Sequence, residues 1–214
     1  DEGSVSIKKE LKIGYLPQLF QLPATLSGFQ FLDYVAVMKG VGPKKERERQ
    51  IFELLEQVNL HAQSHRKIKT YSGGMKQRLG IAQALIGHPD ILIVDEPTAG
   101  LDPEERVRFR NLLAKYSLNH TVILSTHIVA DIESSCHQLA VLHHGRIRMT
   151  GTLDDLQNLA QGKVWEAQLP EEVYSKIPPS RLLSARWTSS GFMCRVISDE
   201  APSDLAVPVH PRLE

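Results

Sequence analysis

Two adjacent carboxylates, Asp95 and Glu96, directly follow an apolar, largely β-branched run at residues 91–94. Such a run predicts a strand buried on both faces of a parallel sheet, with the carboxylates at its carboxyl end. Burying two like charges is costly unless a cation or a catalytic task compensates. Asp95 could hold Mg²⁺ through water while Glu96 orients or deprotonates an attacking water. The alternative is a strand-end turn with solvated carboxylates.

A second candidate begins at Ser72, which is followed by Gly73 and Gly74 and then by a helical pattern. Ser72 is placed as an N-cap, but two glycines in the first turn cost helix stability. They would let a large group approach the backbone N–H groups at the positive end of the helix dipole, an arrangement that suits a phosphate. A plain helix cap explains Ser72 but leaves the two glycines unexplained.

The elements around these residues predict a shared edge. Residues 122–124 form another apolar run ending in Ser-Thr-His127, and Asp102 caps the helix expected between the two runs, with Pro103 at its first position. Strand, helix and strand predict a βαβ unit whose parallel strands end on one edge, where ligands bind in open α/β sheets. His127 taken alone would favour a satisfied structural histidine. Gln18 lies just past a further short strand at residues 12–16, which Pro17 ends.

Between these strands the pattern is helical. Ile51, Leu54, Leu55 and Val58 fall on one helix face, and a second helix is expected from Gly73 to Ile86. From residue 163 onward, short strand-like pieces alternate with prolines and serines. We therefore expect a main domain over residues 1–162, with a helical subdomain at about 24–90, and a small C-terminal appendage over 163–214 whose core holds Trp165 and Trp187.

Composition is that of an ordinary globular protein, with 42% hydrophobic and 23% charged residues among 214. The formal net charge of +0 gives no electrostatic case for binding nucleic acid. Two cysteines without metal-type spacing, Cys136 and Cys194, argue against a disulfide framework. No apolar run approaches the length of a membrane-spanning helix, so we expect membrane contact to be made through a partner.

The motifs taken together resemble those of ABC ATPases. Residues 72–78, Ser-Gly-Gly-Met-Lys-Gln-Arg, match the signature motif of that family, and residues 91–98 resemble its Walker B strand and catalytic glutamate. Residues 99–102, Ala-Gly-Leu-Asp, are similar to the D-loop, His127 to the switch histidine and Gln18 to the Q-loop glutamine. The resemblance covers about residues 12–150. It implies an α/β, P-loop NTPase-like core with a mostly parallel sheet and a helical subdomain.

Roles follow from the resemblance, with ATP and Mg²⁺ as cofactors. Asp95 would bind Mg²⁺ through water, Glu96 would polarise the hydrolytic water, and His127 would contact the γ-phosphate. Gln18 would sense Mg²⁺ and the attacking water. A second ATPase subunit would complete a head-to-tail dimer, in which Asp102 helps to couple the two sites. Its nucleotide would be contacted in trans by Ser72, Gly73, Gly74 and Gln77.

One expected motif does not occur in the sequence. Phosphoryl transfer in this family uses Gly-x-x-x-x-Gly-Lys-Ser/Thr, the Walker A loop, and the 214 residues do not contain it. The resemblance places that loop upstream of Gln18, so we expect Asp1 to be a truncation point. The chain alone is then expected to be inactive, whereas the complete protein hydrolyses ATP.

The segment beginning at residues 162–167 resembles the C-terminal tail of ATPase subunits that pair with separate ABC-2-type permeases in exporters. That resemblance implies a location on the cytoplasmic face of the plasma membrane, held there by the permease, and no nucleic-acid partner. Two alternatives stay open. One is a soluble ABC ATPase acting on DNA or ribosomes, and the other is a non-hydrolysing regulatory module. The transported substrate is not specified by any motif.

Overall fold

The computed structural model describes residues 4, 6, 10–98, 100–189 and 191–212. The chain divides into two compact units, Asp1–Ile128 and Val129–Glu214. This division comes earlier than the boundary expected at Gly162. The expected boundary followed a change in composition, and composition does not report which segments pack together. The extent of the functional domain, residues 1–162, stays a prediction.

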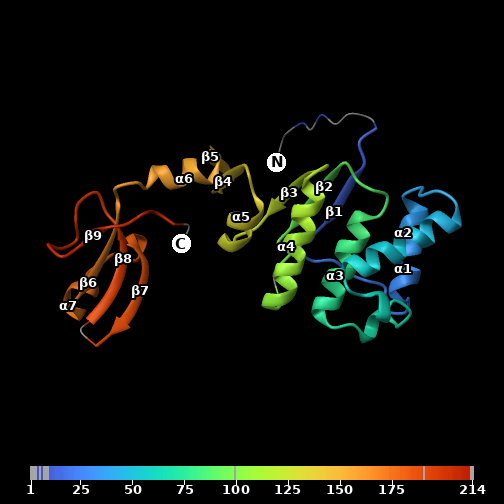
Figure 1. Cartoon of the computed structure of the whole chain (residues 1–214), viewed down its shortest axis with the longest axis horizontal. Helices are drawn as coiled ribbons and strands as arrows, with labels where there is room; N and C mark the ends of the chain where they lie inside the picture. The colour runs from blue at the N-terminus through green and yellow to red at the C-terminus, as the bar shows by residue number, and fades with distance from the viewer. Residues whose placement is uncertain (1–3, 5, 7–9, 99, 190, 213–214) are drawn as a thin grey trace. The chain divides into compact units, whose positions relative to one another are not determined.

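A three-stranded parallel sheet organises the first unit, with the order β1-β2-β3 (Figure 1). Its strands are β1 (Ile13–Leu16), β2 (Ile91–Asp95) and β3 (Thr121–Ser125). Tyr15 pairs with Ile93 and Ile93 with Ile123, so all three carboxyl ends lie at one edge. Helix α4 (Pro103–Ser117) connects β2 to β3. The predicted βαβ unit and its common edge are therefore confirmed.

The region between β1 and β2 is helical, as the periodicity predicts. It contains α1 (Gly28–Met38), α2 (Lys44–Gln57), the 3₁₀ turns η1 (His61–Gln63) and η2 (Ile68–Thr70), and α3 (Gly73–Leu85). The predicted inward face of α2 is buried at Ile51, Leu54 and Leu55. The Lys39 ammonium donates to the carbonyls of Gln83, Ala84 and Ile86 at the end of α3, and burial lowers its pKa.

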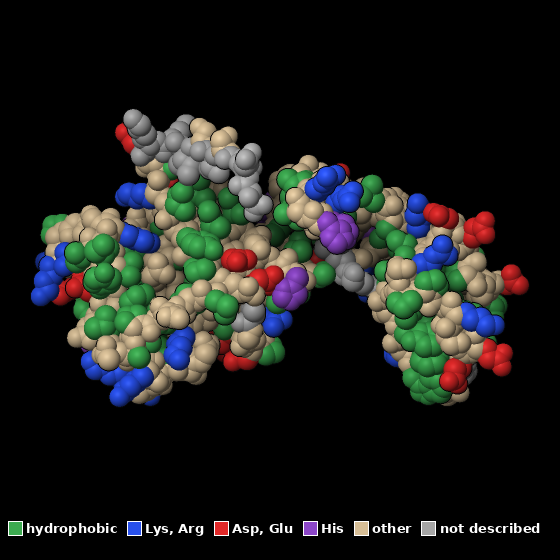
Figure 2. Space-filling view, turned by 180° about the vertical axis from the view of Figure 1, so that it is seen from behind, with side chains coloured by type: hydrophobic (Ala, Val, Ile, Leu, Met, Phe, Trp, Pro, Cys, Tyr) green, Lys and Arg blue, Asp and Glu red, His purple; other side chains and the backbone are tan. Residues whose placement is uncertain are grey.

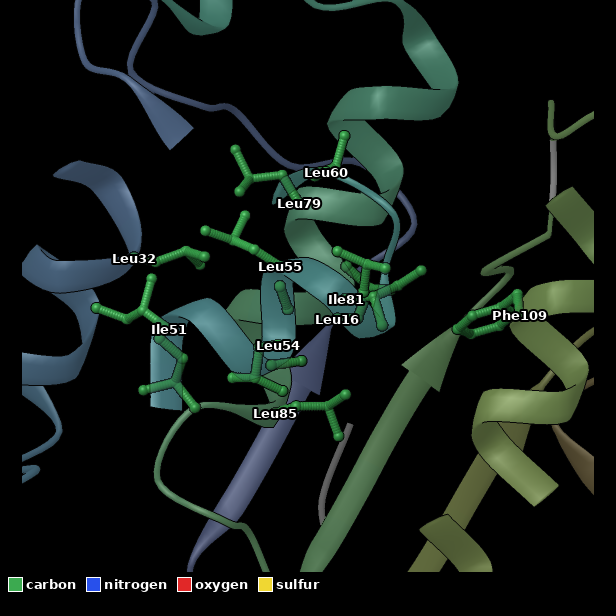
Figure 3. Close-up of a cluster of buried hydrophobic side chains, with 14 of the residues drawn as sticks. Leu16, Leu32, Ile51, Leu54, Leu55, Leu60, Leu79, Ile81, Leu85 and Phe109 are labelled. Carbon is green, nitrogen blue, oxygen red and sulfur yellow. The ribbon is translucent and has the colours of Figure 1, made fainter. Parts of the chain in front are cut away.

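The core of this unit lies between the helices and one face of the sheet (Figure 3). Leu79 and Leu85 of α3 pack there with Leu16 of β1 and Phe109 of α4. Helix α3 lies so close to β1 that a Cβ on Gly14 would collide with the Ala84 carbonyl oxygen. Gly14 therefore sets the distance between the helix that follows Ser72 and the strand that precedes Gln18.

The opposite face of the sheet is open within the first unit. Ile13, Tyr15 and Ile123 share that face and are 40%, 50% and 51% exposed. On the covered face, Leu92 and Val94 are fully buried. The expectation that residues 91–94 are buried on both faces is thus wrong for one face, because the described helices of this unit cover the other face only. Residues 122–124, expected as a second buried strand, are exposed at Ile123.

The second unit contains α5 (Val129–Ser135), a hairpin of β4 (Leu139–His143) and β5 (Arg146–Gly151), and α6 (Leu153–Leu159). A four-stranded sheet follows, with the order β7-β8-β6-β9. Its strands are β6 (Val164–Leu169), β7 (Leu182–Thr188), β8 (Gly191–Ile197) and β9 (Val207–Pro208), accompanied by α7 (Glu171–Tyr174) and η3 (Pro179–Arg181).

The two tryptophans of that sheet differ. Trp165 is half-buried and donates from Nε1 to the Ser198 carbonyl, 3.0 Å away. Trp187 is 64% exposed and meets Phe192 edge-on, so its predicted core position is wrong. Trp187 lies on β7, which is at one edge of the sheet, and the residue type alone does not report how much an edge strand is covered.

Surface charge is mixed in sign. On the face drawn in Figure 2, both Lys or Arg and Asp or Glu side chains occur on each unit. Within the part of the chain that the structure describes, no helix combines the length and apolarity needed to cross a bilayer.

Candidate functional site

The carboxyl end of β2 carries the predicted acidic pair. Asp95 is the last residue of the strand and pairs with Ser125 of β3. Glu96 follows with φ of +47°, and its N–H donates to the Ser125 carbonyl at 2.9 Å. A non-glycine residue in this left-handed region is uncommon, and such strain is concentrated at functional sites. The turn therefore fixes Glu96 against the end of the neighbouring strand.

Glu96 and His127 form a direct contact. His127 Nδ1 lies 2.7 Å from Glu96 Oε1, and the His127 backbone N–H donates to the same oxygen at 3.0 Å. An ionised carboxylate only accepts hydrogen bonds, so Nδ1 carries a hydrogen in this arrangement and Nε2 is left for another partner. The Glu96 side chain is 14% exposed and that of His127 is 75% exposed.

The second carboxylate oxygen of Glu96 is in a different situation. Oε2 is also buried, but it has no hydrogen-bonding partner among the described protein groups. Buried polar atoms without a partner are rare and call for an explanation such as a water or an ion. One oxygen is therefore held by His127, and the other is available to accept a hydrogen bond from a small polar molecule.

Gln18 lies at the same edge, exposed and just beyond β1. Within the described ranges there is no group of three or more His, Cys, Asp or Glu side chains that could hold a metal. A Mg²⁺ ion at this edge would therefore depend on Asp95, with Gln18 nearby, and on oxygens of water and phosphate. Mg²⁺ usually binds proteins in that way. One carboxylate and one amide oxygen are of the ligand type that Mg²⁺ prefers.

The helix start predicted at Ser72 is present at α3. Ser72 is its N-cap, and its hydroxyl accepts from the Met75 N–H at 3.2 Å. A Cβ on Gly73 would meet nothing within 4 Å, and one on Gly74 would only touch Leu101 at 3.8 Å. Packing within the described chain therefore does not require glycine at either position. An external group would therefore have room to approach the backbone at both glycines.

Two other predicted site residues form hydrogen bonds within the chain. The Gln77 side-chain amide donates to the Pro97 carbonyl at 3.0 Å, and this bond occupies a side chain expected to meet nucleotide in trans. Asp102 caps α4, where its Oδ1 accepts from the Glu105 N–H at 2.9 Å. The cap was predicted. The trans contacts of Gln77 and the coupling role of Asp102 remain predictions.

One contact near this site was not predicted. Arg78 Nε lies 3.2 Å from Glu105 Oε2, and each side chain is 17% exposed. The two residues belong to different helices, α3 and α4, and no sequence spacing rule connects them. Their opposite charges were visible in the sequence, but only the packing of the two helices shows that they form a pair.

A cavity among the described residues does not coincide with the predicted chemistry. It measures about 410 Å³ and lies at the amino end of β1, where Lys12 and Ile13 meet the turn between α1 and α2 and the end of α3. Ligands in open α/β sheets bind at the carboxyl ends of strands. The acidic pair, His127 and Gln18 lie at that opposite edge, which we therefore take as the site.

Comparisons with known proteins bear on the family and the fold of the chain. Residues 3–99 match the sequence model of the family described as "ABC transporter". The chain is 36% identical over 188 residues to an uncharacterized ABC transporter ATP-binding protein, YxlF, of Bacillus subtilis, covering 86% of this chain and 63% of the relative. It is also 36% identical over 181 residues to a methionine import ATP-binding protein, MetN 1, of Bacillus thuringiensis, covering 79% of this chain and 53% of the relative.

Among solved structures, a dimeric ATP-binding cassette in a post-hydrolysis state, bound to ADP and Pi, superposes with a TM-score of 0.61. That structure is 28% identical in sequence, and the match covers 66% of this chain and 63% of the other. The fold is therefore that of an ABC ATPase domain. The chain is thus similar to ABC-type nucleotide-binding domains, with its family match at residues 3–99, and it spans about three fifths or less of the length of the two curated relatives named above.

Proposed function

We propose that the complete protein hydrolyses ATP to drive transport through a separate membrane permease. The single observation that carries this proposal is the arrangement of Glu96. It stands at the end of β2, with one oxygen held by His127 and the other buried without a protein partner. Domains of this family bind ATP. The Glu96 arrangement suits the activation of a water at a γ-phosphate.

In the proposed reaction, Glu96 accepts a hydrogen bond from the attacking water and takes its proton as the new bond to the γ-phosphorus forms. The bond between the γ-phosphorus and the ADP oxygen breaks, giving ADP and inorganic phosphate. His127 holds Glu96 through Nδ1, which leaves Nε2 to reach a phosphate oxygen. Mg²⁺, when bound through Asp95 and water with Gln18 nearby, would neutralise phosphate charge.

The start of α3 is proposed to bind the nucleotide held by a second subunit. Supporting this, Ser72 caps the helix and the two glycines after it are not needed for packing. A phosphate approaching Gly73 and Gly74 would meet backbone N–H groups at the positive end of the helix dipole. The working unit would then be a head-to-tail dimer, and the similar solved cassette is dimeric.

The Walker A loop, which binds the phosphates of the nucleotide, is proposed to come from a part of the protein outside these 214 residues. Apart from the missing sequence motif, the support is the sheet itself. Parallel sheets are normally covered on both faces, but Ile13, Tyr15 and Ile123 leave one apolar face exposed. A further strand and helix bearing that loop would cover this face. The chain as given would then bind ATP weakly and hydrolyse little.

The partner is proposed to be a permease of the ABC-2 type, with the ATPase at the cytoplasmic face of the membrane. Export rests on the resemblance of residues 162–167 alone, and one similar protein is named for methionine import. Because that relative is named for import, the direction of transport has to be measured. A transport assay in vesicles that contain the ATPase and its partner permease would determine the direction.

An ATP titration tests the proposal. Isothermal calorimetry of the 214-residue chain should show little or no binding at micromolar ATP, whereas the complete protein should bind ATP with Mg²⁺ and release phosphate. Micromolar binding by the shorter chain would contradict the proposed need for an outside loop. A complete protein that neither binds nor hydrolyses ATP would contradict the proposed function itself.

A further inference from the structure

Arg78 joins three parts of the first unit. Its Nη1 donates to the Val58 carbonyl at 3.2 Å and to the Asn59 carbonyl at 2.9 Å, at the end of α2. Its Nε lies 3.2 Å from Glu105 Oε2 in the first turn of α4. Since Nε makes no aligned hydrogen bond, this last contact is an ion pair rather than a directed bond.

The neighbouring residue on α3 makes a parallel connection. The Gln77 amide donates to the Pro97 carbonyl, directly after Glu96. Arg78 and Gln77 thus hold the segment 97–105 at both of its ends. Between those ends, the Leu101 N–H donates to the Thr98 carbonyl at 3.2 Å, and Asp102 caps α4. We call segment 97–105 with Gln77 and Arg78 the α3–α4 clamp.

The inside of the clamp is packed as well. Thr98 is 1% exposed and Leu101 is 6% exposed. The Leu101 side chain lies beside Gly74, at 3.8 Å from where a Cβ would stand. A shift of the start of α3 is therefore transmitted to Leu101 by contact, and to Pro97 and Glu105 through Gln77 and Arg78.

We infer that Arg78 and Glu105 are positioning residues, which couple the start of α3 to segment 97–105 in the same subunit. This inference rests on the proposed function, in which Ser72 and the glycines meet one nucleotide and Asp102 communicates with the other site. The ion pair suits this task because both side chains are largely buried. Breaking a buried pair leaves an uncompensated charge, so the two helices stay together as one body.

Glu105→Gln tests this role while it preserves the hydrogen bonds around the pair. The substitution keeps the backbone N–H that Asp102 caps and both carbonyl bonds of Arg78, and it removes only the charge. Glu104→Gln is the matched control, because Glu104 is the adjacent residue, is 77% exposed and pairs with Arg108 on its own helix. In the complete protein, Glu105→Gln should lower kcat for ATP roughly threefold or more with KM nearly unchanged.

Cooperativity between the two sites should fall as well, which a purely structural ion pair would not require. The Hill coefficient of hydrolysis should move toward that of independent sites in Glu105→Gln and stay unchanged in Glu104→Gln. In an Arg78→Met background, Glu105→Gln should have little further effect, because the pair is already broken. Equal kcat and equal cooperativity in Glu105→Gln and Glu104→Gln would overturn the inference.

Hydrogen exchange gives a reading that does not depend on ATP. In the 214-residue chain, the amides of Gly100 and Leu101 should exchange faster in Glu105→Gln than in Glu104→Gln, while those of β2 stay protected. If the wild-type complete protein has no ATPase activity, the proposed function fails. The exchange comparison then tests by itself whether the Arg78–Glu105 pair holds segment 97–105. Unchanged exchange at Gly100 and Leu101 would then overturn it.

Discussion

His127 and Glu96 meet through two hydrogen bonds to one oxygen, with Nδ1 at 2.7 Å and the backbone N–H at 3.0 Å from Oε1. The residues come from the ends of neighbouring parallel strands, so the register of β2 against β3 sets their distance. The backbone of Glu96, with φ of +47°, completes the arrangement. The pair is thus a product of the sheet and not of a flexible loop.

Replacing His127 by Ala should reduce ATP hydrolysis in the complete protein about 10- to 100-fold, because Glu96 loses its orienting partner and the phosphate loses a contact. Stability should change by less than about 0.5 kcal/mol, since the side chain is 75% exposed. Phosphate release and urea unfolding measure the two effects. His137→Ala, at another exposed histidine, serves as the control. Equal activity in both variants would remove His127 from the mechanism.

Gly73→Ala should separate folding from function. Nothing lies within 4 Å of the added Cβ, so helix stability should stay the same or rise by up to about 1 kcal/mol. Hydrolysis should nonetheless fall by roughly tenfold or more, because the methyl group would stand where the partner's phosphate approaches. Thermal unfolding and steady-state turnover measure the two quantities.

Gly87→Ala is a control in which stability should fall, in contrast to Gly73→Ala. Gly87 has φ of +84°, so a side chain there is strained and stability should fall by about 1 kcal/mol. A Gly73→Ala protein that is both stable and fully active would show that no group approaches the start of α3 during turnover.

Asp102 has two possible tasks, which a pair of substitutions can distinguish. Asp102→Asn keeps an equivalent N-cap for α4 and should leave stability within about 0.5 kcal/mol, whereas Asp102→Ala should cost about 1 kcal/mol. If Asp102 also couples the two sites, both variants should lose cooperativity in ATP hydrolysis. Full cooperativity in Asp102→Asn would limit the residue to its capping role.

Much of this arrangement follows from local sequence patterns. The apolar runs before Glu96 and His127, the cap at Asp102 and the helical face of α2 each depend on neighbours within one element, and such patterns specify elements well. The common edge then follows from the βαβ rule. Capping by Ser72 was also predictable, because the hydrogen bond it makes spans only three residues.

Contacts between different helices and strands could not be predicted from local sequence patterns. The pairing of Arg78 with Glu105, and of Gln77 with Pro97, depends on how two helices and a turn pack. Periodicity reports which residues face inward but not which inward faces are covered. For that reason the exposure of Ile123 and of Trp187 was predicted incorrectly.

The most direct test of the account is Glu96→Gln in the complete protein. The amide keeps the size of the side chain but cannot take a proton, so turnover should fall about 10²- to 10⁴-fold while ATP affinity stays within about twofold. Glu104→Gln, exposed on α4, should retain wild-type turnover. Phosphate release at saturating ATP with Mg²⁺ measures this. A Glu96→Gln protein that hydrolyses ATP at nearly the wild-type rate would contradict the central claim.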